Sequence, residues 1–154
     1  MKKMLSYVCL LAVFALTSVA WSAERGNKEE AKAVVEKCAN YIKENGKEKA
    51  LNEINNPKGM FVNKDLYIFA YDFEGEVLAH GANQKLIGKN LIEMKDPDGV
   101  YVIKGLIDEA KKGEGWFKYK WTHPQTKKVE GKEAFVKKVD DTLWIGSGIY
   151  REIN

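Results

Sequence analysis

The sequence predicts an α+β fold, with a five-stranded antiparallel sheet, a long N-terminal helix and a helical insert after the second strand. Two segments, residues 28–45 and 100–113, repeat apolar side chains at helical spacing. Five shorter runs have β-strand character, and two of them flank a four-residue turn at residues 72–75. Because the strands come in groups and do not alternate with helices, an antiparallel sheet is favoured.

Residues 1–23 are predicted to be a secretory signal peptide. Lys2 and Lys3 precede an apolar stretch at residues 10–16, and small residues follow at 20–23. The apolar run is at the short end of the roughly 20 residues that a membrane-spanning helix needs, so cleavage is favoured over an uncleaved membrane anchor. Residues 24–154 then form one domain, periplasmic or secreted, with membrane anchoring by the uncleaved N-terminal segment as the alternative.

The charge of the predicted mature chain argues against nucleic acid as a partner. The whole chain has 25 basic and 22 acidic residues, and removing residues 1–23 takes away Lys2 and Lys3 and no acid. The remaining net charge is +1, and no dense Lys/Arg tract is present to follow a phosphate backbone. Cys38 is then the only thiol, so an intramolecular disulfide is excluded, and its place on the apolar stripe of residues 28–45 predicts a buried residue.

The N-terminal third is predicted to be helical. Residues 28–45, "KEEAKAVVEKCANYIKEN", place acids in the first turn and are followed by Gly46, a common helix stop. A second helical piece over residues 47–56 offers Ala50, Leu51 and Ile54 as its apolar face before Pro57 ends the pattern.

The rest of the chain alternates between strands and one helical insert. "DLYIFAYDFEGEVLAHG", residues 65–81, predicts a β-hairpin around its Asp and Gly turn residues. The insert follows the turn Asp96-Pro97-Asp98-Gly99 and groups its apolar residues on one face. They are Val100, Ile103, Leu106, Ile107 and Ala110. Residues 115–123, 132–140 and 142–150 supply the last three strands.

Alternation along residues 115–123, "GWFKYKWTH", separates two faces. Phe117, Tyr119 and Trp121 are predicted to point inward to the insert, whereas Lys118 and Lys120 mark the other face as solvated, with Trp116 near its edge. Tyr and Trp each carry a polar group that needs a partner when buried. The inward face is therefore either the wall of a pocket for a small polar ligand or ordinary core.

Residues 55–99 and 113–150 resemble the single Cache domain family, extracytoplasmic sensor modules with a PAS-like fold, and the likeness extends from about residue 31 to 150. The pattern of Gly, Tyr, Trp and Pro in that family is matched by Gly115, Tyr119, Trp121 and Pro124. A later Pro-Lys-x-x-Tyr pattern keeps Lys132, while Gly131 and Phe135 stand where Pro and Tyr are usual. The missing tyrosine hydroxyl removes one donor that would hold a carboxylate.

The resemblance implies a ligand cavity between the sheet and the helical insert, and a short carboxylate such as acetate, propionate or pyruvate as the ligand. Tyr119, Trp121 and Lys132 are the predicted ligand-binding residues, because a Lys ammonium neutralises a carboxylate while Tyr and Trp donate directional hydrogen bonds. Less central lining residues are Tyr67, Phe69, His80 and Phe135. The small residues Gly146, Ser147 and Gly148 are expected to let a ligand or a neighbouring strand approach the backbone closely.

The predicted function is that of a sensor domain and not of an enzyme. His80 and His123 are the only histidines, and neither lies in a metal-binding or nucleophile motif, so no catalytic residue, metal or cofactor is predicted. The expected partners are a small organic acid and a separate membrane receptor or kinase, with the N-terminal helix as a candidate surface for a homodimer. The alternative is a secreted interaction module that docks on a membrane receptor without a metabolite ligand.

Overall fold

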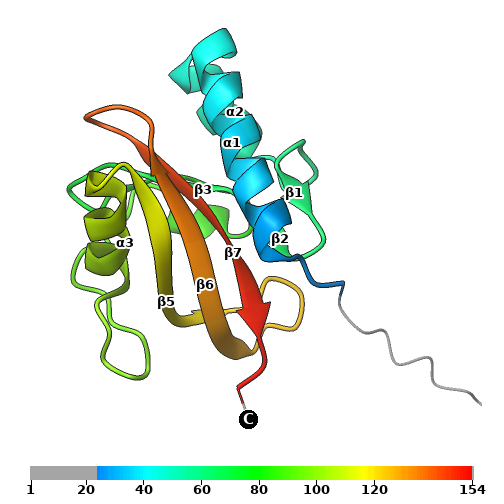
Figure 1. Cartoon of the computed structure of the whole chain (residues 1–154), viewed down its shortest axis with the longest axis vertical. Coiled ribbons are helices and arrows are strands. Elements are labelled where there is room, and N and C mark those ends of the chain that lie inside the picture. The colour runs from blue at the N-terminus through cyan, green and yellow to red at the C-terminus, as the bar shows by residue number, and fades with distance from the viewer. Residues whose placement is uncertain (1–23, 154) are drawn as a thin grey trace, which may run out of the picture.

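The computed structural model describes residues 24–153, so the predicted signal peptide lies outside the described residues. An α+β domain with a five-stranded antiparallel sheet confirms the predicted fold class (Figure 1). The helices are α1 (Lys28–Asn45), α2 (Lys47–Ile54), the short 3-10 helix η1 (Gln84–Leu86) and α3 (Val102–Lys111). The strands are β1 (Val62–Asn63), β2 (Leu66–Tyr67), β3 (Phe69–Tyr71), β4 (Val77–His80), β5 (Glu114–Thr122), β6 (Val129–Lys138) and β7 (Trp144–Arg151).

Helix α1 has the predicted bounds, and both of its ends have a local cause. The Asn27 side chain accepts a hydrogen bond from the Glu30 backbone N–H at 2.8 Å, and the Glu30 carboxylate accepts one from the Asn27 N–H at 3.0 Å. This reciprocal cap satisfies two otherwise unpaired donors. Gly46 ends the helix with φ +86°, a conformation that side chains disfavour. Cys38 is fully buried on the inner face, as predicted, and burial raises the pKa of its thiol to about 12.

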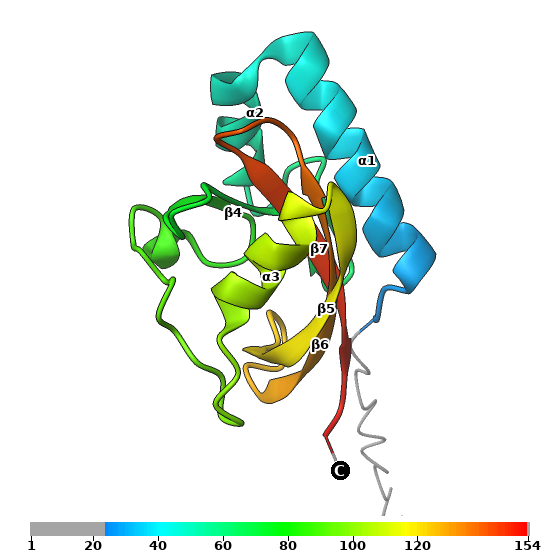
Figure 2. The same cartoon turned by 60° about the vertical axis from the view of Figure 1, so that its left-hand side comes forward.

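The sheet has the strand order β4-β3-β7-β6-β5, so β7 lies at its centre. Helix α1 packs against one face, over β6 and β7, and α3 covers the other face beside β5 and β6 (Figures 1 and 2). Each face has its own hydrophobic cluster, because alternate residues of every strand point to opposite sides. Among the helices within residues 24–153, none has the length and apolar composition required to cross a membrane.

The structure differs from the sequence prediction at three places. The run predicted as one strand over residues 65–71 breaks at Ile68, and β2 pairs with β1 in a separate two-stranded sheet. Val100 precedes α3 and does not share its buried face. Trp116 is half-buried below the start of α1, where its ring lies 5.3 Å from the Phe135 ring, so helix α1 covers part of the face predicted to be solvated.

Two glycines of β7 allow close packing on the α3 side of the sheet. A Cβ at Gly146 would lie 2.6 Å from the Phe69 ring, and a Cβ at Gly148 would lie 2.8 Å from the Ala134 backbone. Side chains larger than hydrogen are therefore excluded at both positions. The expectation that these small residues admit a neighbouring strand is confirmed, and Phe69 owes its position over β7 to Gly146.

A buried polar network fixes the segment that leads into α1. The Asp65 carboxylate accepts a hydrogen bond from the Gly26 N–H at 2.7 Å, and its second oxygen lies 3.3 Å from His123 Nε2. Both side chains of this Asp–His pair are fully buried. His123 Nδ1 accepts hydrogen bonds from two backbone N–H groups of the β5–β6 loop. Only the tautomer with its proton on Nε2 satisfies all of these contacts, so His123 donates to Asp65.

Candidate functional site

A small cavity lies between the sheet and α3, where the predicted ligand cavity was expected. Its volume is about 10 Å³, which is about the space that one water molecule needs. Three apolar residues of α3 form one wall: Val102, Ile103 and Leu106. The sheet supplies the others: Phe69 and Tyr71 from β3, His80 from β4, Tyr119 and Trp121 from β5, and Lys132 from β6.

Lys132 contributes the one basic amine of this wall, and it is almost completely buried, with 3% of its surface exposed. Strand pairing places it opposite Tyr119 on β5 and Tyr150 on β7. Its Nζ donates to the Tyr67 hydroxyl at 2.7 Å and lies 4.2 to 5.0 Å from the ring centres of Tyr67, Phe69 and Tyr150. The amine lies in the interior of the domain, because β6 is an inner strand covered by helices on both faces.

A chain of hydroxyl groups leads from Lys132 to the end of β5. The Tyr67 and Tyr150 hydroxyls lie 2.8 Å apart, and the Tyr150 hydroxyl donates to the Thr122 carbonyl at 3.2 Å. That direction makes the Tyr67 hydroxyl the donor to Tyr150, so Tyr67 is also free to accept from Lys132. Burial raises the pKa of both tyrosines well above the ordinary range, which keeps the two phenols neutral.

His80 closes the same cluster from the end of β4. Its ring lies 5.0 Å from the Tyr67 ring, and its Nδ1 accepts hydrogen bonds from the Ala82 and Asn83 backbone N–H groups at 3.3 and 3.0 Å. Burial is the main cause that lowers the pKa of His80 to about 3, and Lys132 lowers it further whenever its amine is protonated. His80 is therefore neutral at physiological pH and presents an Nε2–H donor.

Acid is expected to destabilise the domain through His80. The folded protein holds His80 at a pKa of about 3, whereas the unfolded chain binds the proton near 6.5, so protons favour unfolding as the pH falls. Between pH 6.5 and 4.5 the free energy of unfolding should fall by roughly 2 kcal/mol through this residue. His80→Asn keeps an acceptor near the Nδ1 position and should lose that part of the dependence. Urea unfolding of both proteins at several pH values between 6.5 and 4.5 gives the free energy of unfolding at each pH. If this free energy falls equally steeply with pH in the parent and in His80→Asn, the lowered pKa assigned to His80 is wrong.

A surface cleft of about 270 Å³ adjoins the cavity. The two share two residues, His80 and Trp121, and Tyr67 also lines the cleft. The rest of the cleft comes from two loops, residues 82–85 after β4 and residues 122–127 between β5 and β6. Because Trp121 and His80 line both spaces, movement of these rings would connect the cavity with solvent.

The structure brings six of the seven predicted site residues together. Five of them line the cavity, namely Phe69, His80, Tyr119, Trp121 and Lys132, and Tyr67 is bonded directly to Lys132. Phe135 does not join them. It lies three residues from Lys132 along β6, so its side chain points to the α1 face and packs in the cluster of Cys38 and Ile42. The inclusion of Phe135 in the site is therefore corrected.

Sequence reasoning missed several neighbours of Lys132. Tyr71 follows Tyr67 and Phe69 at the two-residue spacing of one strand face, a signal that was available. Tyr150 lies directly opposite Lys132 in the β6–β7 register, which only the strand pairing reveals. The Asp65–His123 pair joins residues 58 positions apart and has no local sequence signal.

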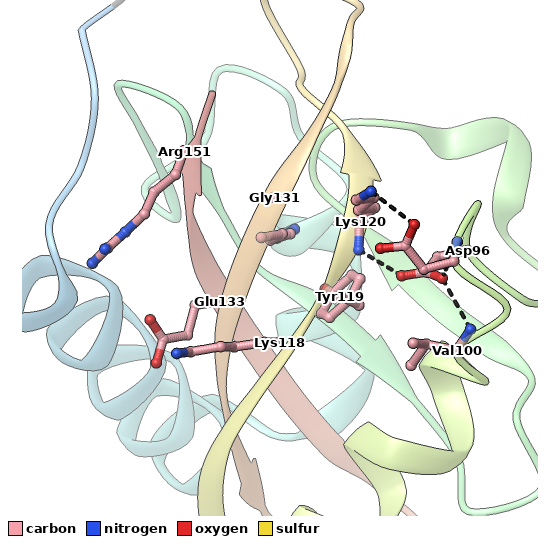
Figure 3. Close-up of a pocket in the computed structure, with 10 residues that line it drawn as sticks. Asp96, Val100, Lys118, Tyr119, Lys120, Gly131, Glu133 and Arg151 are labelled. Atoms are coloured by element: carbon pink, nitrogen blue, oxygen red, sulfur yellow. Dashed lines mark hydrogen bonds and ion pairs between the residues drawn. The ribbon is translucent and has the colours of Figure 1, made fainter. Parts of the chain in front are cut away.

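A wider groove of about 320 Å³ runs over β5 and β6 (Figure 3), and two of its lining residues, Tyr119 and Lys132, also line the cavity. Apart from Asp96 and Lys132, its charged side chains are exposed or half-buried, and several already have partners. Asp96 accepts hydrogen bonds from the Val100 and Lys120 backbone N–H groups at 3.0 and 2.9 Å, and Lys28 pairs with Glu133 at 2.6 Å. The buried amine of Lys132 points to the opposite side of the sheet. We therefore place the candidate site in the enclosed cavity and not in this groove.

Metal ligands do not gather in the described part of the chain. Within residues 24–153, no three His, Cys, Asp or Glu side chains are arranged to hold a metal ion. His80 and His123 each use Nδ1 to accept backbone N–H groups, so neither ring offers that nitrogen as a ligand. The wall residues of the cavity instead suit a small organic anion, with one amine, two phenols and apolar surface.

These features define an α+β domain in which a helix-covered antiparallel sheet encloses a small cavity on one face. The model of the family described as "Single Cache domain 2" matches residues 17–153. The chain belongs to this family, which confirms the resemblance seen in the sequence. The match begins inside the segment predicted as a signal peptide, and the boundary at residue 23 stays a prediction.

Curated relatives of the chain are a sensor histidine kinase and methyl-accepting chemotaxis proteins. The chain is 40% identical over 88 residues to the sensor histidine kinase MctS of Rhizobium johnstonii, covering 56% of this chain and 19% of the relative. It is 30% identical, also over 88 residues, to the methyl-accepting chemotaxis protein McpP of Pseudomonas putida, covering 56% of this chain and 16% of the relative. The chain thus spans less than a fifth of the length of either protein.

Solved structures agree with the fold. A methyl-accepting chemotaxis protein from Vibrio parahaemolyticus superimposes with a TM-score of 0.71 at 32% identity, covering 80% of this chain and 87% of that one. A Cache chemosensory domain described in terms of carboxylic acid recognition gives the same TM-score at 25% identity, with 80% and 92% covered. These similar proteins are sensor modules of chemoreceptors and kinases.

Proposed function

We propose that this domain is an extracytoplasmic sensor that binds a short-chain carboxylate, such as acetate, propionate or pyruvate, in the cavity between the sheet and α3. The observation that carries the proposal is the buried Lys132 amine, whose one hydrogen-bond partner among the described residues is the neutral Tyr67 hydroxyl. An anionic ligand would supply the opposite charge that this position lacks. The carboxylic acid recognition described for a structural relative supports the same ligand class.

We assign distinct roles to the wall residues in this proposal. Lys132 pairs with the carboxylate, while the Tyr119 hydroxyl, the Trp121 indole N–H and His80 Nε2–H are the donors available for its oxygens or for a second polar group. Val102, Ile103 and Leu106 face the short apolar tail of the ligand. With so little apolar depth, short acids should bind better than long ones.

Binding also has to enlarge the cavity. A volume of about 10 Å³ accommodates one water molecule, and even acetate has four heavy atoms. The ligand would therefore enter through the cleft beside Trp121 and His80 and displace α3 or the loops next to it. Such a displacement gives the sensor a conformational signal, which we propose is passed to a membrane receptor or kinase of the kind found among the relatives.

A thermal-shift screen tests the proposal. A ligand that binds the folded state adds about 2.7 kcal/mol at a hundredfold excess over its Kd, which for a domain of this size raises Tm by several degrees. The panel holds acetate, propionate, pyruvate, longer fatty acids, amino acids and amines at equal concentration and ionic strength. Stabilisation by the short acids alone is expected. No stabilisation by any compound would favour the alternative, a module that docks on a membrane receptor without a metabolite.

A further inference from the structure

We propose that Lys132 is a neutral amine in the free protein, and that binding of a carboxylate in the cavity is coupled to the uptake of one proton. This inference rests on the proposed function, because it describes how that site would balance its charge. It adds a property that carboxylate recognition does not require, since an exposed or ion-paired lysine would bind the same acids without exchanging a proton.

The first support is the lack of a compensating anion. Within residues 24–153, no carboxylate oxygen comes within ion-pair distance of Lys132 Nζ, and the Tyr67 hydroxyl is its hydrogen-bond partner. A buried ammonium without a counter-ion loses its hydration and gains little in return. A neutral amine keeps the hydrogen bond to Tyr67 without that cost.

The second support is that the titratable groups facing the amine are electrically neutral. The titratable groups facing it are the phenols of Tyr67, Tyr71, Tyr119 and Tyr150 and the imidazole of His80. Burial raises the pKa of each of these phenols and lowers that of His80, so all five groups are neutral at pH 7 to 8. Helix α3 adds the apolar residues Val102, Ile103 and Leu106. Glu130, two residues along β6, is paired with Arg25 at 2.7 Å.

Two effects oppose deprotonation, and neither outweighs burial. The three aromatic rings near Nζ favour the charged form by cation–π attraction, but they replace neither the lost hydration nor a counter-ion. Asp65 also favours it, but this carboxylate is engaged with Gly26 and His123. The loss of hydration on burying an ammonium is the dominant effect when no counter-ion lies beside it. Burial accordingly lowers the pKa of Lys132 well below its ordinary value, despite the opposing field of Asp65.

A bound carboxylate reverses this balance, because its negative charge lies next to the amine and makes the ammonium favourable again. Above the pKa values of both the free acid and the free Lys132 amine, the ligand arrives as an anion and the lysine takes one proton from solvent. The bound pair is then electrically neutral. In this range the affinity for the carboxylate should fall about tenfold for each unit by which the pH rises, because one proton is taken up with each bound ligand.

Calorimetry on the unmodified protein tests the coupling. Acetate, propionate and pyruvate are titrated at pH 8 in phosphate and in Tris, two buffers with very different ionisation enthalpies, and the difference in heat gives the number of protons exchanged. About one proton per bound acid is expected. Binding with no proton exchange would overturn this proposal and leave the carboxylate sensor intact. No binding in calorimetry or the thermal screen would overturn the sensor function itself.

A measurement without ligand tests the free state. Protein labelled with ¹³C at lysine Cε gives signals that shift when the amine ionises, and Lys132→Met identifies the signal of Lys132 by its loss. Lys118→Met, an exposed position on β5, serves as the matched control. At pH 8 the Lys132 signal should have the position of a neutral amine while the Lys118 signal has that of an ammonium. An ammonium signal for Lys132 would refute the proposal whether or not a ligand is known.

Discussion

Lys132→Met is expected to weaken the binding of a short carboxylic acid by about 10- to 150-fold, which corresponds to the 1.5 to 3 kcal/mol of a hydrogen bond to a charged group. Methionine keeps most of the apolar stem, so the walls of the cavity should remain in place. The free variant should be at least as stable as the parent at pH 7, because it no longer buries an amine that prefers to be charged and hydrated. Calorimetry and thermal unfolding measure the two effects separately.

Lys118→Met provides the comparison for this prediction. Lys118 lies on β5 with its side chain exposed, so its replacement removes one positive charge without touching the cavity. The affinity of the Lys118→Met variant for the acid should stay within about twofold of that of the parent, since surface charges act weakly through solvent. If Lys132→Met binds the acid as well as the parent does, Lys132 does not hold the carboxylate.

Asp65→Ala is expected to lower the free energy of unfolding by about 2 to 5 kcal/mol, because each buried donor that loses its acceptor costs about 1 to 3 kcal/mol. It leaves the Gly26 N–H and His123 Nε2–H buried without acceptors. Because Gly26 leads directly into α1 and His123 holds the β5–β6 loop, both segments should loosen together. Urea unfolding gives the loss of stability, and hydrogen exchange shows which amides become less protected.

Asp65→Asn separates the shape of this residue from its charge. The amide oxygen can still accept from Gly26, while the amide N–H₂ replaces the carboxylate oxygen that faces His123. We expect a smaller loss than in the alanine variant. If both variants lose less than about 1 kcal/mol, the network is not a structural anchor.

The three α-helices and the order along the chain of the five strands of the large sheet could be predicted, because their signals are local. The apolar stripe of residues 28–45, the stop at Gly46 and the turn at residues 72–75 each depend on neighbours in sequence. Strands β1 and β2 have two residues each, which is too short for an alternation pattern. The break at Ile68 was therefore invisible, since the residues on both sides have strand character.

The candidate site was predictable only in part. Alternation along β5 put Tyr119 and Trp121 on the inner face, and both line the cavity. The same reasoning, applied to residues 132–135, would have separated Phe135 from Lys132, because an odd spacing turns side chains to opposite faces. The depth of Lys132 depends on which strands flank β6 and on the helices above them, and these contacts arise from distant parts of the chain.

The central position of β7 has a consequence for how the chain reaches this structure. The β3–β4 hairpin and the β5–β6 hairpin are both made before β7 is synthesised, and β7 is the strand that joins them. Until it inserts, each hairpin keeps an open edge able to pair with another chain. Its contacts with β3 span more than seventy residues, so closing the sheet requires a slow, non-local step. A nascent chain that lacks β7 should thus depend on chaperones far more than the finished domain does.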